Sequence, residues 1–124
     1  FSNQGLNTWV PSSLEIMDSM FEGATNFNGA ISDWVTSNVK SMVAVFADAT
    51  SFNQNLNNWD TSNVENMRDM FYNASAFNGD ISSWDVSKVQ IMAEMFAEAT
   101  SFNGAIGGWT PTSATNLSEM FFNA

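Results

Sequence analysis

Residues 59–83, with the sequence WDTSNVENMRDMFYNASAFNGDISS, are the clearest copy of a pattern that fills the chain. Tryptophan recurs at positions 9, 34, 59, 84 and 109, always 25 residues apart. Phe-Asn pairs at 27–28, 52–53, 77–78 and 102–103 share this period. A fixed period of about 20–50 residues is typical of stacked repeats, in which each unit buries its apolar face against its neighbours. We therefore predict a single repeat domain over residues 1–124.

The period divides the chain into four full units and two partial ones. The full units are 12–36, 37–61, 62–86 and 87–111, and the partial units are 1–11 and 112–124. Neither end carries the distinctive polar segment that caps a free-standing array. We therefore expect the chain to be a fragment of a longer array.

The first half of each unit predicts a short helix. In the unit that begins at Ser62 the apolar residues recur at helical spacing, with polar residues between them: Val64, Met67, Met70, Phe71 and Ala74. A hydroxyl residue precedes this stripe in every unit, where it would cap a helix of about ten residues. This capping column is Ser12, Ser37, Ser62, Ser87 and Thr112. The predicted helix of the third full unit runs over roughly 63–73.

The second half of each unit predicts a turn followed by a short strand. Residues 77–84 contain Asn, Gly, Asp and Ser between the apolar residues, which disfavours a helix interior. A strand near 81–84, paired with its copies in neighbouring units, fits this composition. The sequence thus predicts an α/β fold, a leucine-rich-repeat-like right-handed solenoid with one short helix and one short strand per 25-residue repeat.

Composition excludes several classes of function. The chain has 3 Lys and Arg against 13 Asp and Glu, a net charge of −10, which argues against nucleic acid and anionic membranes. It has no Cys and no His, and no apolar run approaches the ~20 residues of a transmembrane helix. No phosphate-binding loop or gathered set of carboxylates is present. We therefore expect no enzymatic activity, no catalytic residues, no cofactor and no direct insertion into a membrane.

The string WDTSNV at 59–64, followed by Met67, Met70-Phe71, Ala74, Phe77-Asn78, Ile81 and Trp84, resembles the repeat of the BspA-like surface proteins. The resemblance extends over essentially the whole chain. It implies a leucine-rich-repeat-like solenoid and a place at the cell surface or outside the cell. It also implies roles in adhesion and in host or matrix binding, and it supplies no catalytic residues.

Four recurring columns admit a metal-binding or ligand-binding reading beside a structural one. Asp60 and Asp85 occupy the same column of adjacent units, and two stacked carboxylates could hold Ca²⁺. No Asp-x-Asp-Gly loop is present, so we favour a solvated or helix-capping role and expect no metal site. The Trp and Met columns could stack on carbohydrate or bind soft metals, but their place on the apolar period favours core packing. The Asn column 28, 53, 78 and 103 is predicted to form a structural ladder between units.

The predicted binding surface consists of small polar residues between the Phe-Asn and Trp columns: Asn55, Asn57, Asn58, Asp80, Ser82 and Ser83. Repeat arrays commonly bind partners on such extended surfaces. Without aromatic or Arg anchors, affinity is expected to be weak and multivalent. Two sequons, at Asn73 and Asn116, are candidates for N-glycosylation.

We therefore expect a cell-surface or secreted module that binds a protein, an extracellular-matrix component or a glycan. The alternative is a structural spacer or a self-assembling component of an extracellular filament or cell envelope, in which the partner is the chain itself. Repeat ends without caps motivate the alternative, because exposed end units invite stacking.

Overall fold

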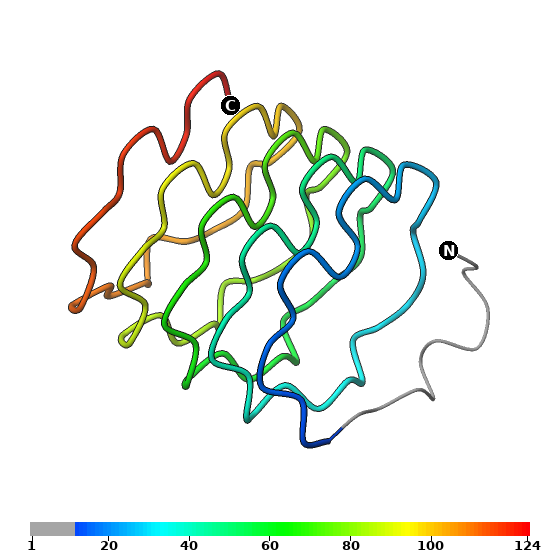
Figure 1. The fold of residues 1–124 in the computed structure, drawn as a ribbon. Coiled ribbons are helices and arrows are strands. Elements are labelled where there is room, and N and C mark those ends of the chain that lie inside the picture. The colour runs from blue at the N-terminus through cyan, green and yellow to red at the C-terminus, as the bar shows by residue number, and fades with distance from the viewer. Residues whose placement is uncertain (1–11) are drawn as a thin grey trace.

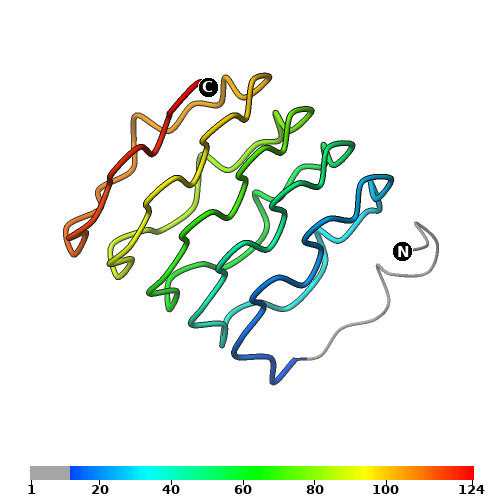
Figure 2. The same ribbon diagram turned by 45° about the horizontal axis from the view of Figure 1, so that its top comes forward.

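The computed structural model describes residues 12–124, which form a stack of irregular coils (Figure 1). We number the coils from the sequence units: coil 1 is 12–36, coil 2 is 37–61, coil 3 is 62–86, coil 4 is 87–111 and coil 5 is 112–124. Each of the first four has a front arm, which is its first 13 residues, and a back arm that returns behind it (Figure 2). Coil 5 consists of a front arm. The partial unit 1–11, with Trp9, lies outside the described residues.

The predicted right-handed, leucine-rich-repeat-like α/β solenoid is wrong. Residues 12–124 contain no helix, so no helix there is long and apolar enough to cross a membrane. Their β-type pairing is limited to isolated parallel bridges, one between each pair of neighbouring coils. These bridges join Ile16, Ser41, Asn66, Ile91 and Asn116 in turn. They lie on the front arm, in the segment where the sequence predicted a helix.

The front arm is a succession of tight turns. In coil 3, the backbone N–H groups of Met70, Tyr72 and Ala74 donate to the carbonyl oxygens three residues earlier, at 3.3, 3.0 and 3.0 Å. Asp69 and Asn73 have φ of 57° and 54°, in the left-handed region that a right-handed helix does not use. The chain therefore reverses every few residues and places apolar side chains on its inner side at nearly helical spacing.

Four other N–H groups of the front arm donate to the next coil. In coil 3, those of Met67 and Asp69 reach the carbonyls of Ile91 and Ala93 at 2.9 and 3.1 Å. Those of Phe71 and Asn73 donate to coil 4 in the same way. The same four positions donate upward from coils 1, 2 and 4, and the N–H at the position of Glu65 donates back to the coil below. These backbone bonds between coils replace the bonds expected within helices.

The predicted helix cap and the predicted strand are also wrong, because turns occupy both positions. Ser62 begins no helix: its N–H and Oγ both donate to Asp60 Oδ1, at 2.9 and 2.6 Å. In the back arm, the N–H of Trp84 donates to the Ile81 carbonyl at 3.2 Å, closing a turn where a strand was expected. Polar side chains and turns thus organise both arms.

Columns of aromatic side chains fill the space between the arms. Phe46 is fully buried and stacks on Phe71 of the next coil, with ring centroids 5.5 Å apart, and on Phe52 of its own coil at 4.1 Å. Trp59 and Trp84 are 3% exposed and stack at 6.4 Å. The structure confirms core packing for Trp34, Trp59 and Trp84 and for the central methionines, such as Met67 and Met92.

Two side-chain ladders tie the back arms together. The indole N–H of Trp84 donates to the Leu56 carbonyl of the coil below at 2.9 Å, and Trp59 and Trp109 repeat this bond. Asn53 Oδ1 accepts the backbone N–H of Asn78 at 2.8 Å, and the same bond joins 28 to 53 and 78 to 103. The predicted asparagine ladder is confirmed, with the backbone of the next coil's Asn as its partner.

Candidate binding surface

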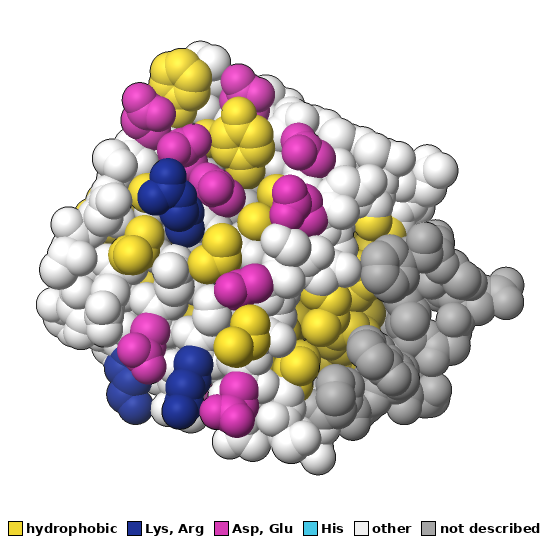
Figure 3. All heavy atoms as spheres, in the orientation of Figure 1, with side chains coloured by type: hydrophobic (Ala, Val, Ile, Leu, Met, Phe, Trp, Pro, Cys, Tyr) yellow, Lys and Arg dark blue, Asp and Glu magenta, His cyan; other side chains and the backbone are white. Residues whose placement is uncertain are grey.

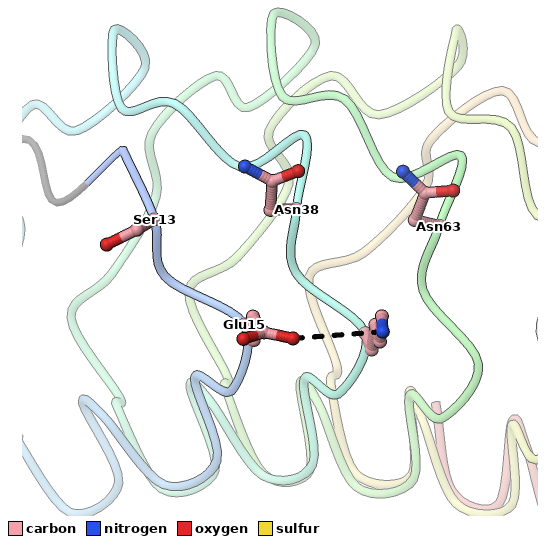
Figure 4. Close-up of a pocket in the computed structure, with 5 residues that line it drawn as sticks. Ser13, Glu15, Asn38 and Asn63 are labelled. Atoms are coloured by element: carbon pink, nitrogen blue, oxygen red, sulfur yellow. Dashed lines mark ion pairs between the residues drawn. The ribbon is translucent and has the colours of Figure 1, made fainter.

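A furrow crosses the front arms of coils 1 to 3 at the level of the bridges. It consists of two adjoining hollows of about 430 and 410 Å³ that share Glu15 and Lys40. The residues that line it are Ser13, Glu15, Ile16, Asn38, Lys40, Ser41, Asn63, Glu65 and Asn66. Figure 4 shows Ser13, Asn38 and Asn63 in one row across three coils, with Glu15 and its ion pair below them. The furrow therefore runs along the axis of the stack.

Hydrogen bonds between coils fix the backbone of the furrow. The N–H of Lys40 donates to the Glu15 carbonyl at 2.7 Å, and the N–H of Glu65 donates to the Lys40 carbonyl at 2.8 Å. Asn38 and Asn63 anchor the upper row, because each donates from Nδ2 to a serine carbonyl of the coil below, at 3.1 and 2.7 Å. The floor and one wall are thus held in place before any partner binds.

The side chains over this floor are polar, mixed in charge and accessible. Lys40 Nζ lies 3.7 Å from Glu15 Oε1, and these side chains are 61% and 64% exposed. An ion pair at such exposure contributes at most about 1 kcal/mol and rearranges readily for a ligand. Ile16, 63% exposed, adds an apolar contact beside them. The furrow can therefore offer hydrogen bonds, both charges and one aliphatic surface to an extended chain.

The surface predicted from the sequence lies on the back arms, away from the furrow. Asn55, Asn58, Asp80, Ser82 and Ser83 are exposed, and Asn57 is half-buried. Several of their polar groups already hold the coils: Ser83 donates to Asn57 from both N–H and Oγ. Asn55 and Asp80 each accept the N–H two residues ahead, at 2.8 and 3.0 Å. Asn58 is the member whose side chain makes no hydrogen bond within the described residues.

Asp60 and Asp85 close the turns that lead from one coil into the next. Asp60 Oδ1 accepts from Ser62, and Asp85 Oδ1 accepts the N–H of Ser87 at 2.9 Å. The hydrogen bonds from Ser87 hold the pKa of the Asp85 carboxyl below its ordinary value. Within residues 12–124 no three acidic side chains gather in a way that could hold a metal ion. The two residues close turns, and their lack of a metal stays a prediction.

Figure 3 shows acidic side chains gathered on the upper half of the face in view. The charges of Glu94 and Glu22 both act on Asp69. Arg68 bridges Asp69 and Glu94, at 3.7 and 3.8 Å. Asp69 Oδ1 is buried without a hydrogen-bond partner. Burial and, next, the charge of Glu94 raise the pKa of the Asp69 carboxyl, while Arg68 lowers it. The ionised Asp69 side chain therefore destabilises the front arm.

One family model matches the chain, over residues 1–109 and again over 56–124. It describes a mycoplasma protein family of unknown function, the DUF285 family. The chain belongs to the DUF285 family. No curated protein matches the chain, and no solved structure matches it.

The furrow of this DUF285 chain was missed at the sequence level. Its lining residues belong to columns that vary from unit to unit, such as Glu15, Lys40 and Glu65. The mixture of opposite charges within one column was the available signal. When the coils stack in register, Lys40 lies between Glu15 and Glu65 of the same column.

The two sequons of the chain lie at structural positions. Asn73 has a φ of 54°, and its Nδ2 donates to Asp48 Oδ1 at 2.8 Å. Asn116 Oδ1 accepts from both N–H and Oγ of Ser118, at 3.0 and 2.8 Å. Both residues are half-buried. A glycan on either amide would have to displace these contacts.

Proposed function

We propose that this chain is a non-enzymatic binding module of a cell-surface or secreted protein, and that it holds an extended protein or matrix partner along the furrow. The observation that carries the proposal is the row of equivalent side chains that three successive coils present in register over a fixed backbone floor. A linear partner lying along the stack axis would meet one such site per coil. Weak contacts would then add through multivalency.

The chemistry of the furrow favours a polypeptide over a nucleic acid. Glu15, Lys40 and Glu65 alternate in charge, and the amide oxygen of Asn38 accepts no hydrogen bond from a described residue. A polypeptide backbone supplies donors and acceptors for the Asn row, and its charged side chains can replace the Glu15–Lys40 pair. The location at the cell surface rests on the resemblance to BspA-like repeats.

A solid-phase assay on collagen, fibronectin and laminin tests this function. Lys40→Glu removes the single positive charge among the nine furrow residues, and Asn38→Ala removes an amide of the upper row. We expect the double variant to weaken binding at least tenfold. Asn58→Ala with Ser82→Ala, on the back arms, is the matched control and should leave binding unchanged.

The opposite outcomes are equally informative. Loss of binding in the control pair with full binding by the furrow variant would move the site to the back arms. Failure of the unmodified chain to bind any of these proteins at high density would contradict the proposed function. The alternative role, a structural spacer, predicts that last result.

A further inference from the structure

The spacing of the coils sets the spacing of the charges in the furrow. Parallel bridges join coils 1, 2 and 3 at the positions directly after Glu15, Lys40 and Glu65. Backbones paired in this way lie about 4.8 Å apart. Two such steps place equivalent backbone positions of coils 1 and 3 about 9.6 Å apart. Glu15 and Glu65 therefore present like charges at this interval, with the opposite charge of Lys40 midway.

This column of charges is exposed in the interior of the stack. Lys40 and Glu65 are exposed although each has a coil on both sides, and Gln90 continues the exposed column in coil 4. The Glu65 carboxylate forms no ion pair with a described residue, and that of Glu15 pairs with the accessible Lys40. Both carboxylates can therefore bind cationic groups of a partner.

The interval of about 9.6 Å discriminates between the regular conformations of a bound polypeptide. A polyproline II helix rises about 3.1 Å per residue with three residues per turn, so side chains i and i+3 share one side about 9.3 Å apart. In a β-strand, side chains on one side lie about 6.8 or 13.6 Å apart. Two turns of an α-helix span about 10.8 Å. The polyproline II helix matches the two glutamates best.

The backbone of a polyproline II helix also matches the polar groups of the furrow. It has no internal hydrogen bonds, so its carbonyl groups are open to a partner. Asn38 and Asn63 each donate from Nδ2 to a serine carbonyl, at 3.1 and 2.7 Å. An amide nitrogen has two hydrogens, so each keeps one for a ligand carbonyl. Lys40 Nζ supplies further donors when its exposed ion pair with Glu15 opens.

We propose that the furrow binds a segment in the polyproline II conformation that carries Lys or Arg at every third position. Basic side chains at positions i and i+3 pair with Glu15 and Glu65, and Lys40 donates to a backbone carbonyl between them. The net charge of −10 attracts such a cationic segment from a distance. This inference rests on the proposed function and specifies the chemistry of the partner.

Synthetic peptides separate the effect of spacing from that of charge. The probe is a fluorescein-labelled peptide of three Pro-Pro-Lys repeats, which places all its lysines on one side of the helix. The control peptide has the same composition with lysine at every second position of its central segment, so its three lysines point to three different sides. We expect fluorescence anisotropy at low salt to show about threefold weaker binding of the control peptide, because only one of its lysines reaches a glutamate.

Variants of the chain assign this preference to the two glutamates. Glu15→Gln with Glu65→Gln should weaken binding of the probe about tenfold and abolish the difference between the two peptides. Glu22→Gln with Glu119→Gln removes the same charge from exposed side chains outside the furrow, and should preserve that difference. Equal binding of the two peptides by the unmodified chain, or no binding of the probe, would overturn the inference.

The matrix assay distinguishes failure of this inference from failure of the proposed function. Matrix binding that depends on the furrow, together with equal binding of the two peptides, would retain the function and reject a polyproline II partner. Probe binding through Glu15 and Glu65, with no binding to any matrix protein, would support the inference and contradict the proposed matrix partner.

Discussion

At the scale of single residues, the tryptophans combine two roles that are usually separate. Trp84 is 3% exposed, stacks between Trp59 and Trp109, and donates its indole N–H to the Leu56 carbonyl. The ring fills the core, and the N–H satisfies a carbonyl of the neighbouring coil. This dual use explains why the period of the chain is carried by tryptophan.

Substitutions at Trp84 should separate the two roles. Trp84→Ala should lower the free energy of unfolding by about 3–5 kcal/mol, the usual effect of emptying a large aromatic site. Trp84→Phe retains a ring but removes one of the two donors to the Leu56 carbonyl, which still accepts the Trp59 N–H at 3.0 Å, and the lost hydrogen bond should cost about 0.5–1.5 kcal/mol. Urea denaturation measures both. A near-zero cost for Trp84→Ala would mean that the column faces solvent.

Backbone conformation at the turns gives a second prediction. Gly23 has a φ of 72°, and a Cβ there would meet nothing within 4 Å. Gly23→Ala should therefore destabilise only through the left-handed conformation, by about 1 kcal/mol. Ala44, with a φ of 55°, is the reverse case: Ala44→Gly should be neutral or stabilising by up to ~1 kcal/mol. Equal losses of thermal stability in both variants would contradict left-handed turns at these positions.

Asp69 gives a prediction about pH. Burial and the charge of Glu94 raise its folded-state pKa above the ordinary value of an Asp carboxyl, so its ionisation opposes folding at neutral pH, and this penalty disappears as the pH falls below that ordinary value. Asp69→Asn should stabilise the chain by ~0.5 kcal/mol at neutral pH, since Asn tolerates positive φ and removes the repulsion from Glu94. Melting temperatures of the two proteins should converge on acidification. A variant that is less stable than the parent at neutral pH would refute this.

At the scale of the element, the sequence predicted which residues are buried but not the backbone that buries them. Val64, Met67, Phe71 and Ala74 are all fully buried, as their spacing indicated. Successive turns, each closed by a hydrogen bond between residues three positions apart, produce the same spacing. Periodicity alone therefore could not distinguish these turns from a helix. The column at 23, 48, 73, 98 and 123 was the available signal, because Gly, Asp or Asn, which favour positive φ, stand at four of its five positions, with Glu98 as the exception.

The asparagine ladder is the element-scale device that the sequence did predict. Asn53→Ala removes the acceptor of the Asn78 N–H and should destabilise by about 1 kcal/mol. Asn58→Ala, an exposed amide without a described hydrogen bond, should change stability by less than ~0.5 kcal/mol. Chemical denaturation compares the two. If both variants lost the same stability, the asparagine ladder would not stabilise the fold.

At the scale of the whole molecule, stability comes from contacts between coils. The front arms of coils 1 to 4 each send alternate N–H groups to the next coil, and the column of Phe46, Phe71 and their counterparts runs through all five coils. Bonds of this kind join residues 24 positions apart, and local sequence patterns carry no direct sign of them. The candidate furrow depends on the same register, which is why it could not be located before the coils were placed.

The central claim is that the front arms are stacked turns bonded between coils, and one hydrogen bond decides it. The N–H of Phe71 donates to the Met95 carbonyl at 2.9 Å, whereas a helix would direct it to the Met67 carbonyl. Nuclear magnetic resonance detects the scalar coupling that passes through such a bond. We predict a coupling from the Phe71 amide nitrogen to the Met95 carbonyl carbon. A coupling to the Met67 carbonyl carbon instead would contradict the account.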